Sequence, residues 1–131
     1  MQIDLPDVLA EVRAEFDRYE QALIANDVAT LDAIFYADPR TIRYGGGENL
    51  YGHQEIAAFR SARSAAGLMR GLSRTVITTY GRDFAVASTL FHRESVPGKI
   101  GRQMQTWVRF KDGWHVVAAH VSMIDDPGTP P

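Results

Sequence analysis

Apolar residues recur at helical spacing in the first half of the chain and at strand spacing in the second half, and this order limits the possible folds. The helical spacing covers residues 7–26, a shorter stretch that ends before Asp38, and residues 53–65. Four later segments are rich in Val, Ile, Thr, Phe and Trp and predict strands over residues 72–80, 83–94, 100–110 and 114–124. Helices followed by a run of strands favour an α+β domain over an alternating α/β fold.

Two shorter extended segments complete the predicted sheet. Residues 41–44 and 49–51 have strand character and are separated by the glycines at 45–47. We expect the N-terminal helices to pack in the concave face of a strongly curved antiparallel sheet. Such a sheet makes a cone with a pocket between helix and sheet, where small-molecule sites are commonly found.

Length and composition predict one globular domain. The chain has 131 residues, 45% hydrophobic and 23% charged, which suits a single domain over residues 1–126 followed by a loose tail over 127–131. A net charge of -2 argues against a nucleic-acid-binding surface. No apolar run is long enough for a membrane helix and no signal peptide is recognisable, so we expect a cytoplasmic protein without a membrane partner.

Familiar catalytic and metal-binding motifs are missing from the sequence. The absence of cysteine excludes disulfides, a thiol nucleophile and a thiolate metal site. The four histidines do not show metal-ligand spacing, and no serine-hydrolase, phosphate-loop or dinucleotide motif occurs. We therefore expect no metal and no cofactor.

Two residues stand out as candidate ligand contacts. Arg43 ends a short strand before the glycines, where a guanidinium can bind a carboxylate with two hydrogen bonds. Tyr19 lies on the apolar stripe of the first helix, where its hydroxyl can reach into the cone or its ring can simply pack in the core.

The last two strands carry further candidates. Gln105 and Trp107 share one face of their strand, which is either a polar and aromatic wall for a ligand or an exposed face with one packed indole. His120 interrupts an apolar strand and is either a core histidine or a pocket residue that titrates near neutrality. Ser122 has the same strand parity as His120, so we expect both to face the same side.

Several segments resemble a known family. They read RTIRYGGGENLYG at 40–52, GRQMQTWVR at 101–109 and WHVVAAHVS at 114–122. They are similar to small proteins of the HpxZ and AtzH type, in the nuclear transport factor 2-like (SnoaL-like) superfamily. The resemblance implies a cone-shaped fold and a role in oxalurate catabolism, purine degradation or cyanuric acid degradation, beside an amidase-signature hydrolase partner. It also implies functional roles for Tyr19 and Arg43.

The resemblance implies a cofactor-free decarboxylase that converts urea-1,3-dicarboxylate to allophanate, or a related step on a small anionic ureido carboxylate. Arg43 would orient a carboxylate, Tyr19 would donate a proton, and His120 would be a second acid-base group. Gln105 and Trp107 would hold the planar urea. The remaining candidate substrate-binding residues are Arg63, Tyr44 and Ser122.

Two other functions remain open from the sequence. The chain can be a non-enzymatic scaffold subunit of the hydrolase, because one fold supports many functions. It can also be an isomerase or cyclase for an apolar ring, which an inward-facing Arg43 would oppose. Apolar residues on the predicted outer sheet face indicate a homodimer in either case.

Overall fold

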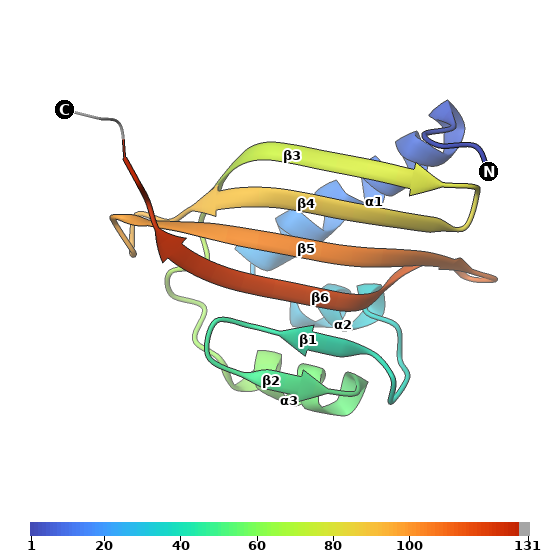
Figure 1. Ribbon diagram of the computed structural model, residues 1–131. Coiled ribbons are helices and arrows are strands. Elements are labelled where there is room, and N and C mark those ends of the chain that lie inside the picture. The colour runs from blue at the N-terminus through green and yellow to red at the C-terminus, as the bar shows by residue number, and fades with distance from the viewer. Residues whose placement is uncertain (129–131) are drawn as a thin grey trace.

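The computed structural model describes residues 1–128 and confirms the predicted α+β architecture (Figure 1). Within these residues the helices are α1 (Pro6–Ile24), α2 (Val28–Ile34) and α3 (His53–Ala62). The strands are β1 (Ile42–Tyr44), β2 (Asn49–Tyr51), β3 (Gly71–Tyr80), β4 (Phe84–His92), β5 (Lys99–Phe110) and β6 (Gly113–Asp125). All three helices lie on one side of a single curved sheet, and the other side faces away from them (Figure 1).

The curved sheet is antiparallel, as predicted, except at one pair of strands. Its strand order is β2-β1-β6-β5-β4-β3, and β1 pairs with β6 in parallel while the other neighbours are antiparallel. The chain reaches β1 from α2 in the helical layer, so no tight hairpin forces β1 to run opposite to β6. A parallel bridge between Phe35 and Val116 already aligns the two segments before β1 begins.

The apolar stripe of α1 forms the centre of the core. Val8, Val12, Phe16, Tyr19 and Leu23 are all 4% exposed or less, as their spacing predicts. They belong to one cluster with buried residues of α2 and of the concave sheet face. The first helix therefore fills the cone, and its C-terminal half forms one wall of the open end.

Helix α3 ends three residues earlier than the sequence pattern predicts. Its apolar spacing extends to residue 65, but Arg63 already has extended backbone, and its N–H donates to the carbonyl of Phe59 at 3.1 Å. This early end places the Arg63 side chain in the cavity described below. The predicted loose tail spans residues 127–131, of which 129–131 lie outside the described residues.

The outer sheet face carries exposed apolar side chains, and the homodimer remains a prediction on this basis. Met104 of β5 is 54% exposed, and Val76 and Phe84 of β3 and β4 are 56% and 41% exposed. Patches of this kind on a small domain indicate an interface.

Sedimentation of the purified protein should give the mass of a dimer. Met104→Asp should shift the equilibrium toward monomer, because the variant would bury a carboxylate charge in the dimer interface. A monomer mass that is independent of concentration would contradict the prediction.

Candidate functional site

A cavity of about 650 Å³ opens at the end of the cone between the helices and the sheet. Its apolar walls come from α1, α3, β4 and β6, and they include Leu23, Phe59, Phe91 and Val121. The charged lining residues are Arg43, Glu48, Arg63, Arg70 and Arg93. Four arginines against one lining glutamate make this a strongly cationic cavity in a protein whose net charge is -2. Such a local concentration of positive charge attracts small anions.

Arg43 faces into this cavity from β1. It pairs in register with Leu50 and Ala119, both on the buried side of the sheet, and is itself only 8% exposed. Its Nη1 donates to Oε1 of Glu48 at 2.9 Å, and its guanidinium carbon lies 5.6 Å from the centre of the Phe59 ring. A carboxylate of this same chain therefore occupies part of the guanidinium that a ligand carboxylate would use.

Gly45 makes the contact between Arg43 and Glu48 possible. A Cβ atom at position 45 would lie 1.8 Å from the Glu48 carboxylate oxygen and 2.9 Å from Nη1 of Arg43. The β1–β2 turn can thus fold its glutamate back over the arginine only because residue 45 has no side chain. Gly46, which also lines the cavity, has open space around it.

Tyr19 of α1 lines the same cavity and is 3% exposed. Its ring centre is 6.2 Å from that of Phe35, and the guanidinium of Arg60 lies over Phe35 at 4.0 Å. Burial lowers the pKa of Arg60 to about 10, and the neighbouring Tyr19 phenol partly offsets that shift. The Tyr19 hydroxyl thus belongs to a cationic environment, where a proton donor is well placed to serve an anionic ligand.

A buried network fixes Arg70 at the side of the cavity. Arg70 is paired with Glu20 of α1, with an Nε to Oε2 distance of 3.1 Å, and its Nη2 donates to Oε1 of Gln103 at 2.8 Å. The guanidinium also lies 4.4 Å from the ring centre of Phe91. Gly101 makes room for that ring, because a Cβ there would be 2.1 Å from it. The charge of Arg70 is therefore already compensated by the protein itself.

Gln105 and Trp107 lie deeper than the cavity. They are on the concave face of β5, as their shared parity predicts, and are 1% and 0% exposed. Nε1 of Trp107 donates to Oε1 of Gln105 at 3.2 Å, so the two polar groups bind each other. Neither residue lines the cavity, and Gln103 is the glutamine of this strand that does. The predicted contact of Gln105 and Trp107 with a ligand is not supported by this position.

His120, Ser122 and Tyr44 lie on the opposite, outer face of the sheet, which corrects their predicted place in the pocket. His120 is exposed and pairs in register with exposed Met104, and its ring meets the edge of Tyr44 at 6.2 Å. Ser122 accepts a hydrogen bond from Nε of Arg102 at 3.2 Å on the same face. These three residues cannot contact a ligand in the cavity, and we assign them no part in the site.

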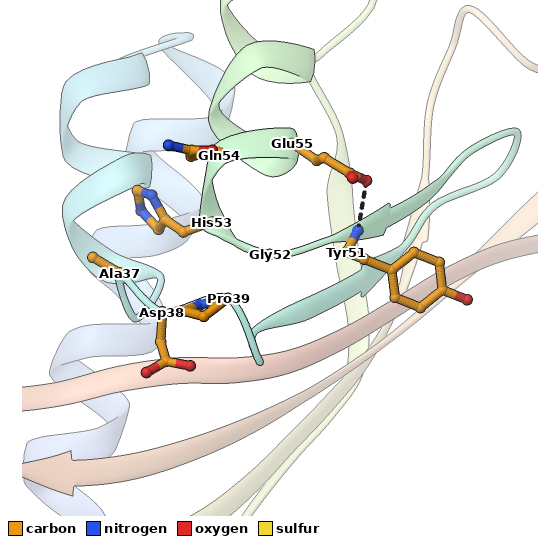
Figure 2. A pocket seen from close by; sticks show the side chains of 8 residues that line it. All are labelled: Ala37, Asp38, Pro39, Tyr51, Gly52, His53, Gln54 and Glu55. Carbon is orange, nitrogen blue, oxygen red and sulfur yellow. Dashed lines mark hydrogen bonds between the residues drawn. The ribbon is translucent and has the colours of Figure 1, made fainter.

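A second depression of about 500 Å³ lies between the loop after α2 and the start of α3 (Figure 2). Its polar groups are already engaged. Asp38 accepts hydrogen bonds from Arg40 at 2.9 Å, which lower the pKa of this carboxyl to about 2, and Glu55 accepts from the backbone of Tyr51 at 2.9 Å. His53 bonds to the carbonyl of Asp32 at 2.7 Å. The depression therefore offers few free groups to a ligand.

Neither a metal cluster nor a membrane span is found in the part of the chain that the structure describes. Residues 1–128 contain no group of three or more His, Asp or Glu side chains that could hold an ion. No helix in the same range is both long and apolar enough to cross a membrane.

Helices held in a curved sheet around a ligand-sized cavity define a protein of the nuclear transport factor 2-like fold. A superfamily member from Salmonella enterica serovar Typhimurium shares this fold with a TM-score of 0.74 at 24% identity, over 94% of this chain and 95% of that one. A family model described as AtzH-like matches residues 1–127, and the chain belongs to this family. The resemblance inferred from the sequence motifs is thereby confirmed.

Two solved structures are much more similar in sequence. A protein of unknown function of the DUF3225 family from Pectobacterium atrosepticum is 61% identical, with a TM-score of 0.92 over 94% of this chain and 95% of that one. A cystatin-like fold protein from Burkholderia xenovorans is 46% identical, with a TM-score of 0.93 over 97% and 99% of the two chains. No curated protein matches the sequence.

Sequence reasoning missed Glu48 and Arg93 of the cavity and the pairing of Arg70 with Glu20. Glu20 and Arg70 are 50 positions apart and meet only in the folded chain, and Glu48 and Arg93 stand in or beside turns where charged residues are common. The one available signal was the number of arginines near the ends of predicted elements. Of the predicted residues, the structure brings Tyr19, Arg43 and Arg63 together at one cavity.

Proposed function

We propose that the protein is a cofactor-free enzyme that removes CO2 from a small ureido dicarboxylate, with urea-1,3-dicarboxylate as substrate and allophanate as product. The observation that carries the proposal is that Arg43 and Tyr19 line one cationic cavity. Its volume of about 650 Å³ exceeds what such a small molecule needs, and its charge matches an anion. The same charge argues against an isomerase or cyclase for an apolar ring.

The reaction needs one proton and no oxidant. The bond between a terminal carboxylate carbon and the urea nitrogen breaks, and its electron pair stays on the nitrogen. The carboxylate leaves as CO2, and the nitrogen takes a proton from the Tyr19 hydroxyl, which solvent then reprotonates. Proton delivery as the bond breaks avoids a free nitrogen anion, which is the ordinary role of a general acid.

Arg43 would bind the carboxylate that is retained in allophanate. A guanidinium paired tightly with the departing carboxylate would stabilise the substrate more than the transition state, because that carboxylate loses its charge as it becomes CO2. Binding at the retained end instead fixes the urea relative to Tyr19 without opposing the reaction. Glu48 would have to leave Arg43 when the substrate binds.

The proposal is tested by measuring CO2 release from urea-1,3-dicarboxylate with purified protein. Because the substrate also decomposes spontaneously, the rate must be compared with that in buffer alone and with a Tyr19→Phe variant. Wild-type protein should exceed the buffer rate in proportion to its concentration. A wild-type rate equal to the buffer rate, together with binding to an amidase-signature hydrolase, would instead favour the scaffold function.

A stable dicarboxylate should raise the melting temperature through Arg43. Glutarate suits this experiment because it has three atoms between its carboxyl carbons, as urea-1,3-dicarboxylate does, and it cannot decarboxylate by the same route. Binding to the native state raises the melting temperature by mass action. Arg43→Ala should lose most of the shift, and Glu48→Gln should enlarge it because the competing carboxylate is gone. Equal shifts in all three proteins would place the anion site elsewhere.

A further inference from the structure

Two of the four cavity arginines have no carboxylate partner among residues 1–128. Arg43 is paired with Glu48, and Arg70 is paired with Glu20. Within residues 1–128, by contrast, Nε and Nη2 of Arg63 and Nε of Arg93 are buried and have no hydrogen-bond partner. A buried donor without a partner is costly, and more so when it is charged.

The two unpaired guanidinium groups line the same cavity. Burial is the main cause that lowers the pKa of both arginines, and the charge of Arg70 and, less strongly, that of Arg63 further lower the pKa of Arg93. Arg93 lies 4.8 Å from the ring centre of Phe91, on the side of the cavity where Arg70 also contacts that ring. Arg43 repels Arg63 and lies toward the β1–β2 turn. Besides the paired Arg43 and Arg70, the cavity thus holds two guanidinium groups, those of Arg63 and Arg93, whose buried N–H groups have no partner among the described residues.

We propose that Arg63 and Arg93 form a second anion subsite, so that the cavity selects a dicarboxylate over a monocarboxylate of the same size. An anion there would supply the acceptors that the buried N–H groups lack and would remove the repulsion between the two arginines. Arg93 thereby becomes a specificity-determining residue. The orientation of urea-1,3-dicarboxylate between the two subsites rests on the function proposed above. The preference for a ligand with two carboxylates does not.

The second subsite fits the chemistry proposed for the cavity. With the retained carboxylate on Arg43, the departing carboxylate would lie toward Arg63 and Arg93, and the nearby Tyr19 phenol acts on the pKa of both arginines. Because the departing carboxylate loses its charge as it becomes CO2, these two guanidinium groups would select and position the dicarboxylate and would not themselves lower the barrier. Allophanate has lost one carboxylate and would bind more weakly than the substrate, which favours product release.

A matched pair of ligands separates the two subsites. Glutarate carries two carboxylates, and glutaramate replaces one of them with an uncharged amide of nearly the same shape. Isothermal titration calorimetry on the full chain should show that wild-type protein binds glutarate about tenfold or more tightly than glutaramate, since one charge-assisted contact is lost.

Arg63→Gln and Arg93→Gln should each lower the affinity for glutarate toward that for glutaramate and leave glutaramate binding nearly unchanged. Arg43→Ala should weaken both ligands. Arg102→Gln, on the outer sheet face, is the matched control and should leave both affinities unchanged. Neither Arg63→Gln nor Arg93→Gln should lower the melting temperature of the unliganded protein, because each removes an unpaired buried charge. A merely structural role for these arginines would lower it.

An unchanged ratio of glutarate to glutaramate affinity in both glutamine variants would overturn the second subsite. The proposed function can fail while the second subsite stands. That is the outcome if wild-type protein binds glutarate more tightly than glutaramate but does not release CO2 from urea-1,3-dicarboxylate faster than buffer. If a glutamine variant does not fold, Arg93→Lys replaces it, since lysine keeps the charge and loses the planar fork. That variant should retain part of the preference for glutarate, and full retention of the wild-type ratio would contradict a role for the Arg93 fork.

Discussion

Tyr19→Phe is expected to lower the rate of catalysed CO2 release by about a hundredfold to ten-thousandfold, the range typical of a lost general acid. Phenylalanine keeps the ring that packs 6.2 Å from Phe35 and removes only the hydroxyl. The melting temperature should therefore stay close to that of the wild type. Binding of glutarate should also change little, because the carboxylate contacts come from the arginines.

The measurement needs a tyrosine control outside the cavity. Tyr80 of β3 lies on the outer side of the sheet against Phe84, with ring centres 6.1 Å apart, so Tyr80→Phe should keep wild-type activity. A Tyr19→Phe variant that folds, binds glutarate and still decarboxylates at the wild-type rate would remove Tyr19 from the mechanism. Loss of activity together with loss of glutarate binding would instead indicate a role in positioning the ligand.

The elements of this fold could be predicted from the sequence because burial alternates regularly along most of them. In β5 the odd positions Gln103, Gln105 and Trp107 are all buried, while Arg102 and Met104 are exposed. In α1 the three- and four-residue spacing identifies the buried stripe, including Tyr19. Local periodicity is enough to predict which side chains are buried in these elements, because the geometry of a regular helix or strand decides which face each side chain lies on.

The face of the sheet on which His120 lies could not be predicted from strand alternation, because β6 contains a bulge. Trp107 pairs with Val116, but its neighbour Thr106 pairs with Ala118, so Val117 is an extra residue. Before the bulge the even positions of β6 face the helices, and after it the odd positions do. His120 and Ser122 therefore share a side, as expected, but it is the outer one. Nothing in the local sequence marks a bulge at Val117.

The charge of the cavity was equally hidden from local patterns. A net charge of -2 gives no sign of a cationic site, because the arginines that form it come from β1 and from the segments beside α3, β3 and β4. Only the fold shows that Arg70 is neutralised by Glu20 whereas Arg63 is not. Sequence resemblance identified Tyr19 and Arg43 as functional residues. The folded structure was needed to show which arginines of the cavity have a carboxylate partner and which do not.

Arg43→Lys is expected to lower the rate of CO2 release by about a hundredfold to a thousandfold, although the charge is kept. The Arg43 guanidinium already gives one hydrogen bond to Glu48 at 2.9 Å from a position that is 8% exposed. An ammonium at this site is a point donor that Glu48 can occupy alone, so a substrate carboxylate would lose the planar two-bond contact that orients the urea.

Removing the competing carboxylate tests this explanation directly. In the double variant Arg43→Lys with Glu48→Gln, glutarate binding should recover in part because the introduced ammonium no longer faces a competing carboxylate. The rate should stay low because orientation is still lost. Arg109→Lys, whose partner Asp83 is exposed, is the control and should be fully active. Full activity of Arg43→Lys would show that charge alone suffices at this position, and the two-bond contact would then have no part in catalysis.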